Sequence, residues 1–477
     1  MLSLKSLAIS ALALSSIASA RNVPIKKTLT GHIDPSEVFS FVYVPFEVGL
    51  GTTSIYVLQD YSAKSNGNAL DLGIFDQRGQ ILEASRGWSG GFRNNFTVTP
   101  SWATPGYNAG PIQPGTWNVV LGPYTSVDEG IDWQLDIEMG FDPVDSYFAV
   151  DFASMNFDSL CNGVCTEEGE WLRGDLHLHT VYSDGRYTPE EQIEIAAKQD
   201  LDFIFFSDHN TDTSNNTMGS FQDLASDLLI GRGIEVTTRA GHWKALGLDP
   251  DQLVEWRHKD TESYISAAQE VHRRGGLVSI DHPFAECSAC NWVFDHWDHS
   301  DAIEVWNAAW NATDQQAVSK WQEILVEGRF TTAIGGSDSH SAPALNGIPT
   351  TVVRSRGKSQ SAIIEGMKSG LAYLVQGPGL ELSLKVLLPS LLKPNTAGIG
   401  DKVKTSTVGA TAVLETKGFA GQRVSFVTDR GYIHNSTLRQ DGTVKRFVPL
   451  GAMFIRVEVR NHTDDAMMGM TNPVWFL

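Results

Sequence analysis

Between about residues 170 and 376 the sequence alternates predicted strands with predicted helices, and this alternation limits the fold more than any other feature. Thr188-Pro189-Glu190-Glu191 has the form of a capping box with proline at the first helical position, which predicts a helix through about Gln199. Other predicted helices lie at about 261–274, 313–327 and 359–369. The predicted strands are 202–206, 229–237, 245–248, 277–280, 303–306 and 331–335. Such repetition predicts a parallel barrel or a doubly wound sheet, with functional residues at the carboxyl ends of its strands.

The segment 174–184, Gly-Asp-Leu-His-Leu-His-Thr-Val-Tyr-Ser-Asp, carries the first candidate ligands. If 175–180 is a short strand, alternation places His177 and His179 on the same side. Two imidazoles at the mouth of a strand are typical of a metal site. For a single histidine, a satisfied position in the core is the competing interpretation, and further ligand-type residues at later strand ends would decide against it.

Ligand-type residues do recur at the ends of the later predicted strands, and ten of the thirteen histidines lie between His177 and His340. They are Asp208 and His209 in Ser-Asp-His-Asn, Glu235 at the end of its strand, His242 in Gly-His-Trp-Lys-Ala-Leu-Gly, His282 in Asp-His-Pro, and Asp338 and His340 in Gly-Gly-Ser-Asp-Ser-His. Core packing would have to explain each of these positions independently. The pattern therefore favours metal binding.

These motifs resemble those of the PHP (polymerase and histidinol phosphatase) superfamily. The Gly-His-x-x-Ala-Leu-Gly element and the flanking β-rich segments are most similar to its carbaryl-hydrolase-like (CehA/McbA) branch. The resemblance covers about residues 170–376 and implies a distorted (β/α)7 barrel with two or three divalent metal ions.

The resemblance also implies a ligand set. The first metal would be held by His177, His179, Glu235 and Asp338, and Glu235 would bridge to a second metal held by His242 and His282. Asp184, His209 and His340 would form a third site. Many family members carry histidine at the position of Asp184, so this residue decides whether the centre holds two metals or three.

Mixed imidazole and carboxylate ligands suit Zn, Mn or Fe without choosing among them. Two metals about 3.5–4 Å apart can hold a hydroxide between them, which predicts attack by metal-bound hydroxide on a phosphoryl or acyl centre. His340 or His209 would move protons if the third metal is absent. Asp208, a further catalytic candidate, either orients a neighbouring ligand or is a cap or turn aspartate, and Asp281 has the same two interpretations.

The leading functional hypothesis is a secreted metal-dependent phosphoesterase that hydrolyses a phosphomonoester or a small, nucleotide-like phosphodiester. The alternative is a carbamate or carboxylic ester hydrolase with the same metal centre. A third hypothesis is a non-catalytic protein that binds polysaccharide or cell wall. A small-molecule substrate is expected, while the formal charge of −20 argues against binding of duplex nucleic acid. The oligomeric state is not predicted.

The first twenty residues are expected to be a signal peptide, with Lys5, a short apolar run and an Ala18-Ser19-Ala20 cleavage site. The apolar run is too short for a membrane span, so a secreted protein is predicted. Sequons fit a glycoprotein and occur at Asn95, Asn215, Asn311, Asn435 and Asn461. An oxidising compartment favours disulfides over a four-thiolate zinc site for Cys161, Cys165, Cys287 and Cys290, with their connectivity open.

Short alternating runs separated by turns predict an N-terminal β-sandwich, jelly-roll-like, over 28–155. Strand patterns return over 379–477 and predict a small immunoglobulin-like β domain. Within the central domain, the tryptophan-rich segment 291–310 either walls a substrate pocket or packs in the core, and His296-x-x-His299 resembles a ligand pair. Arg186 either meets an anionic substrate or is a solvated loop charge.

Overall fold

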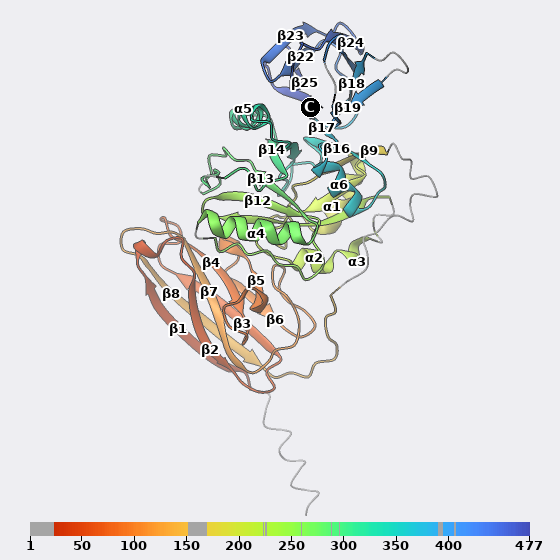
Figure 1. Ribbon diagram of the computed structural model, residues 1–477. Coiled ribbons are helices and arrows are strands. Elements are labelled where there is room, and N and C mark those ends of the chain that lie inside the picture. The colour runs from red at the N-terminus through yellow and green to blue at the C-terminus, as the bar shows by residue number, and fades with distance from the viewer. Residues whose placement is uncertain are drawn as a thin grey trace, which may run out of the picture. The chain divides into compact units, whose positions relative to one another are not determined.

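The computed structural model describes residues 23–150 and 169–477, except 223, 225–226, 259, 288, 295, 390–394 and 405–406. The predicted signal peptide, Cys161 and Cys165 lie outside the described residues. The chain forms two compact units, Met1–Val150 and Asp151–Leu477 (Figure 1).

The first unit is a sandwich of two four-stranded antiparallel sheets with the orders β1-β8-β3-β6 and β2-β7-β4-β5. Each strand of the first half therefore pairs with its counterpart counted back from the end, as in a jelly roll. The strands are β1 Ile25–Ile33, β2 Val42–Val48, β3 Ser54–Tyr61, β4 Ala69–Phe75, β5 Ser85–Trp88, β6 Asn95–Val98, β7 Gly115–Thr125 and β8 Ile131–Gly140. Single 3-10 turns lie at Pro35–Glu37, Leu82–Ala84 and Gly90–Phe92.

Alternating side chains of both sheets form one core in this unit. Ile55 and Val57 of β3 are fully buried, while Tyr56 between them is exposed. Leu72 and Val119 face them from the other sheet and are also fully buried. Because buried and more exposed side chains alternate along β3 and β8, the sequence pattern specifies the register of the first sheet.

The second unit is built on a curled sheet in which β9 to β15 are neighbours in chain order. These strands are β9 Glu170–Asp175, β10 Phe203–Phe206, β11 Leu229–Thr238, β12 Gly241–Leu246, β13 Leu277–Asp281, β14 Ala302–Asn307 and β15 Thr332–Gly336. The chain just beyond β9 also lies beside the chain just beyond β15, because Leu178 and Ser339 form an isolated parallel bridge. The carboxyl ends of the first and last strands therefore meet.

Helices connect only some of these strands. They are α1 Pro189–Lys198, α2 Thr213–Thr217, α3 Gly219–Gln222, α4 Thr261–Arg273, α5 Ala312–Val326 and α6 Gln360–Lys368. The capping box at Thr188 is confirmed, since the Thr188 amide donates to Glu191 Oε2 and the Glu191 amide to Thr188 Oγ1. The other helices predicted from the sequence are also present, within a residue or two at each end.

The strictly alternating (β/α)7 barrel expected from the family resemblance is not confirmed, and the unit is rich in strands. β12 runs antiparallel to both β11 and β13, and it begins at Gly241, four residues earlier than predicted. β11 and β12 form a hairpin whose turn is held by Thr238 Oγ1, which donates to the Gly241 carbonyl at 2.7 Å. A hairpin this short leaves no room for a crossover helix.

The sheet continues from β9 through β16 and β17 into β26, β25, β22 and β23. A second sheet, β19-β18-β21-β24, shares a buried core with this extension. The domain boundary predicted at 376–379 stays a prediction. β17 lies before this position and pairs with β26, which lies after it. The strands are β16 Thr350–Ser355, β17 Ala372–Val375, β18 Glu381–Leu388, β19 Asn395–Gly398, β20 Lys402–Val403, β21 Thr411–Lys417, β22 Arg423–Thr428, β23 Gly431–Thr437, β24 Gly442–Phe447, β25 Phe454–Arg460, β26 Met467–Thr471 and β27 Val474–Phe476.

The structure can be compared with two of the predictions, the lack of a membrane span and the sequons. In the part of the chain that is described, the helices are too short or too polar to cross a membrane. Asn215 of the predicted sequons is fully buried in α2, where its Oδ1 accepts a hydrogen bond from the Gly233 amide at 3.2 Å. A glycan at Asn215 is therefore incompatible with this packing.

Candidate metal centre

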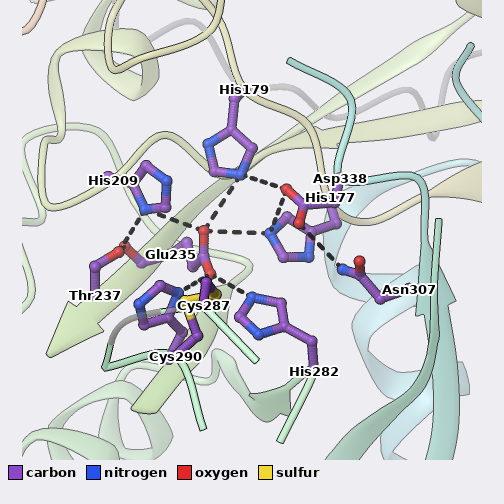
Figure 2. The surroundings of a disulfide bond; sticks show 11 residues. His177, His179, His209, Glu235, Thr237, His282, Cys287, Cys290, Asn307 and Asp338 are labelled. Carbon is purple, nitrogen blue, oxygen red and sulfur yellow. Dashed lines mark hydrogen bonds and ion pairs between the residues drawn. A yellow bond between two sulfur atoms is a disulfide. The ribbon is translucent and has the colours of Figure 1, made fainter. Parts of the chain in front are cut away.

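The candidate ligands converge around Glu235 of β11 (Figure 2). Most follow the carboxyl ends of β9, β10, β13 and β15, whereas His242 lies at the amino end of β12, which runs in the opposite direction. Two of them have the left-handed backbone that is uncommon outside glycine, with φ of 25° at His282 and 50° at Asp338. Close packing also requires Gly185, where a Cβ atom would lie 2.6 Å from the Thr180 amide nitrogen. Local strain of this kind is typical of functional sites.

Four atoms form a first group: Nε2 of His177, Nε2 of His179, Oε2 of Glu235 and Oδ1 of Asp338. The Glu235 oxygen lies 3.2 Å from each of the two nitrogens. The Asp338 oxygen lies 3.4 Å from His177 Nε2 and 3.1 Å from His179 Nε2. All four atoms are buried and lack a hydrogen-bond partner. Tetrahedral ligands at 2.0–2.2 Å from zinc are roughly 3.3–3.6 Å apart, and these nitrogen–oxygen distances are similar. His177, His179 and Asp338 together satisfy the spacing of a metal site, with Glu235 beside them.

The other oxygen of Glu235 belongs to a second group. Oε1 lies 2.8 Å from His242 Nδ1 and 3.0 Å from His282 Nε2. His177, Glu235 and His282 together satisfy the spacing of a metal site, and His242 lies beside them with a buried Nε2 that has no hydrogen-bond partner. The structure therefore brings together the residues expected for the second metal and adds His177 to them. Glu235 is placed to be shared between the two groups.

A third group consists of His179, Asp184, His209 and His340. Asp184 Oδ1 lies 3.2 Å from His340 Nε2 and 3.5 Å from His209 Nε2. The side chains of Asp184 and His340 are 40% and 34% exposed, whereas those of His177 and His179 are fully buried. Solvent therefore reaches the centre on the side of the third group. His179 connects the groups, since its Nε2 faces the first and its Nδ1 faces Asp184.

The electrostatics of the centre suit a bound cation. Burial raises the pKa of Glu235, but the surrounding histidines, His209 first, more than offset this and hold that pKa well below its usual range. Burial lowers the pKa of His179, but Asp338 and Glu235 outweigh it and raise the pKa to about 10. The carboxylates thus stay ionised, and without a metal His179 keeps a proton. A divalent ion would take the place of that proton.

His209 has the opposite protonation. Its burial is the largest influence and lowers its pKa to about 4, although Glu235 and Asp184 act against it. His209 is therefore neutral at pH 7 and has a free nitrogen lone pair. Its Nδ1 also contacts Thr237 Oγ1.

Asp208 lies behind the loop that carries Asp184. Its Oδ1 accepts hydrogen bonds from the Thr180 amide at 2.8 Å and from Ser183 Oγ at 2.7 Å, and its Oδ2 accepts one from Thr180 Oγ1 at 2.9 Å. These contacts orient the loop. A catalytic role for Asp208 stays a prediction.

Sequence reasoning missed Lys244, Glu304 and Asn307. Lys244 lies in the quoted Gly-His-Trp-Lys motif, and Glu304 interrupts an apolar strand. Both side chains are fully buried next to His177. Asn307 donates to Glu304 Oε2 at 3.1 Å and to Asp338 Oδ2 at 3.2 Å. A charged residue inside an apolar strand was the available signal, because such a residue is buried only when it is paired.

Cys287 and Cys290 form a disulfide in the loop after His282, so this pair does not belong to a thiolate zinc site (Figure 2). The disulfide loop is bound to the start of β12, where the Gly241 amide donates to the Ala289 carbonyl at 3.1 Å. The loop is thereby fixed beside His242.

The other candidates of the central domain lie outside the three groups. Trp292 and Trp306 are 8% and 1% exposed and pack in the core, as the second interpretation of this segment held. The rings of His296 and His299 are 6.0 Å apart, and neither joins a candidate group among the described residues. The Arg186 amide donates to the His340 carbonyl at 2.7 Å, while its side chain is exposed.

No protein-family model matches the chain. No curated protein matches it in sequence. Similar solved structures include a two-domain protein containing a predicted PHP-like metal-dependent phosphoesterase from Bacteroides vulgatus, with 16% identity, a TM-score of 0.37, and coverage of 70% of this chain and 100% of that one. A putative metal-dependent phosphoesterase from Bifidobacterium adolescentis has 18% identity, a TM-score of 0.28, and coverage of 36% and 90%. An amidohydrolase from Chromobacterium violaceum has 16% identity, a TM-score of 0.26, and coverage of 36% and 88%. At these TM-scores the similarity does not identify a family, and the chemistry follows from the three groups themselves.

Proposed function

We propose that this chain is a metal-dependent hydrolase, and more specifically a secreted phosphoesterase of the PHP type that acts on a phosphomonoester or a small phosphodiester. The observation that carries the proposal is the buried set of His177, His179, Glu235 and Asp338, in which each carboxylate oxygen lies 3.1–3.4 Å from both Nε2 atoms and none of the four atoms has a hydrogen-bond partner. Two further groups adjoin this set through Glu235 and His179. A bound cation would satisfy these buried atoms, which otherwise depend on the proton that His179 keeps.

Divalent ions, when bound, supply Lewis acidity at the phosphoryl oxygens and lower the pKa of water. The chain's own residues hold and orient these ions, and they leave the third group open to solvent. His209 is neutral at pH 7 and lies at this open side, and His340 near it is partly exposed. These two histidines are proposed to move protons at the open side if no third ion is present.

The charge of the centre favours an anionic substrate. Two divalent ions carry +4 against −3 from Glu235, Asp338 and Asp184, which leaves +1 among the candidate ligands. The negative charge of the whole chain does not oppose this, because nearby ions dominate the local field. The aromatic segment 291–310 gives little support to a neutral carbamate or carboxylic ester, because its Trp292 and Trp306 are buried in the core.

Secretion remains part of the proposal. The Cys287–Cys290 disulfide supports it, because disulfides persist in oxidising compartments.

A substrate panel tests the proposal. Metal-loaded protein is assayed with nitrophenyl phosphate, bis-nitrophenyl phosphate and naphthyl methylcarbamate, beside His179→Ala as the inactive control. Hydrolysis of either phosphate ester that is lost in the control is expected. Hydrolysis of the carbamate alone would replace the proposed substrate class, and rates in the His179→Ala protein equal to wild type would refute the site.

A further inference from the structure

Three charged side chains lie together beneath the first and second groups, on adjacent strands. Lys244 is on β12, Asp281 on β13 and Glu304 on β14. All three side chains are fully buried. Lys244 lies two residues beyond His242 on the same strand, so it occupies the same face of the sheet one step deeper.

Lys244 pairs with both carboxylates. Its Nζ lies 2.7 Å from Asp281 Oδ1 and 2.9 Å from Glu304 Oε1. One ammonium thus lies between two carboxyl groups in a site without solvent, directly beside His177. Buried charges of this kind are retained only where pairing and hydrogen bonding compensate their desolvation.

Glu304 contacts residues of both metal groups. Its Oε1 lies 2.9 Å from His177 Nδ1, and its Oε2 accepts a hydrogen bond from the His282 amide at 3.2 Å. Asn307 extends the contact to Asp338, since its amide group donates to Glu304 and to Asp338. Glu304 therefore lies behind three of the candidate ligands without joining either group itself.

The two neighbours of His177 Nδ1 require different positions of the imidazole proton. Glu304 can only accept a hydrogen bond there, whereas the Lys244 ammonium, also 2.9 Å away, can only donate one. Donation from Lys244 requires the imidazole proton on Nε2, which would block the atom that faces Glu235 and Asp338. Donation from Nδ1–H to Glu304 leaves the Nε2 lone pair free for a metal.

We propose that Glu304, held by Lys244 and Asp281, is a positioning residue that fixes His177 in the tautomer able to bind metal. The Lys244 ammonium pairs with the two carboxylates, so Glu304 remains the acceptor for the proton on His177 Nδ1. The arrangement is a carboxylate–histidine pair that raises the basicity of the ligand and fixes its ring. This inference rests on the metal centre of the proposed function.

The test compares Glu304→Gln with Asp281→Asn as the matched control. Both variants neutralise a carboxylate bound to Lys244, but only Glu304 contacts His177. Zn²⁺ affinity is measured by competition with a chelator, and stability of the metal-free proteins by urea unfolding. Glu304→Gln is expected to weaken Zn²⁺ binding about 10–100-fold, as for other partners behind metal ligands. Asp281→Asn leaves the Glu304–His177 contact in place, so it should lose less affinity even if it loses more stability.

Equal losses of affinity in the two variants, or an unchanged affinity in Glu304→Gln, would overturn the inference. If Glu304→Gln does not fold, ¹⁵N NMR of histidine-labelled wild-type protein decides the question. A proton on His177 Nδ1 in the Zn²⁺-loaded protein supports the inference, and coordination through Nδ1 overturns it. A wild-type protein that binds no Zn²⁺ would instead refute the metal centre itself, so the two failures are distinguishable.

Discussion

Replacement of Glu235 by glutamine tests whether one carboxylate serves two metal groups. Oε2 of Glu235 lies 3.2 Å from both His177 and His179, and Oε1 lies 3.0 Å from His282. Glutamine has nearly the same shape but no charge, and its nitrogen cannot coordinate. Asp184→Asn is the matched control, because Asp184 belongs to the third group alone.

The expected magnitude follows from linkage between binding and folding. A metal at 100 times its dissociation constant stabilises the folded chain by about 2.7 kcal/mol. Loss of a residue behind a metal ligand weakens binding by up to about 100-fold, so loss of a direct ligand should weaken it at least as much. At an affinity about 100-fold weaker, the same metal concentration stabilises the folded chain by only about 0.4 kcal/mol. Each affected ion thus loses about 2.3 kcal/mol. Glu235→Gln should lose about 5 kcal/mol of metal-dependent stability across two ions, and Asp184→Asn about 2 kcal/mol.

The assay is urea unfolding of each protein with and without Zn²⁺, with elemental analysis of the same samples. Far-UV circular dichroism confirms that the metal-free variants are folded. The sharing of Glu235 is refuted if Glu235→Gln and Asp184→Asn lose the same number of ions, or if Glu235→Gln keeps the wild-type difference between the two unfolding curves.

Two further predictions concern stability and loop position. Burial lowers the pKa of His258 to about 4 from 6.5, so the folded protein holds this side chain neutral where the unfolded chain would protonate it. The free energy of unfolding should therefore fall by about 3 kcal/mol as the pH decreases from 6.5 toward 4. Urea unfolding between pH 7 and pH 4 should therefore show a steeper loss in the metal-free wild type than in His258→Gln, and parallel curves would contradict this. Asp208→Ala leaves the buried Thr180 amide without its acceptor, which should cost about 1–3 kcal/mol and lower the occupancy of the third group. Elemental analysis that finds full occupancy in Asp208→Ala would show that this carboxylate does not hold the Asp184 loop.

The strand ends could be predicted from the sequence because each one joins an apolar run to a ligand-type residue. His209, Glu235, His282 and Asp338 were found in this way, since strand order is a local pattern. His177 and His179 were assigned to a strand over 175–180, which is wrong, because β9 ends at Asp175 and both histidines follow it. The helices at 189–198 and 312–326 were equally predictable, because capping residues and apolar periodicity mark them.

Other features depend on contacts that no local pattern contains. The use of both nitrogens of His179 by two groups is visible only when the loop with Asp184 folds back on the strand. Glu304 lies between Ile303 and Val305 and was taken as part of an apolar strand, because its partner Lys244 is far away in sequence. The direction of β12 depends on the hairpin at Thr238, which a search for strand–helix repeats passes over.

The central claim is that the converging histidines and carboxylates hold divalent metal ions. Its most direct test is elemental analysis of wild-type protein that was purified without chelator and dialysed after exposure to Zn²⁺. The three groups predict about two or three ions per chain, with one fewer in Asp184→Asn if the third group is occupied. Less than one ion per chain in folded protein would contradict the account.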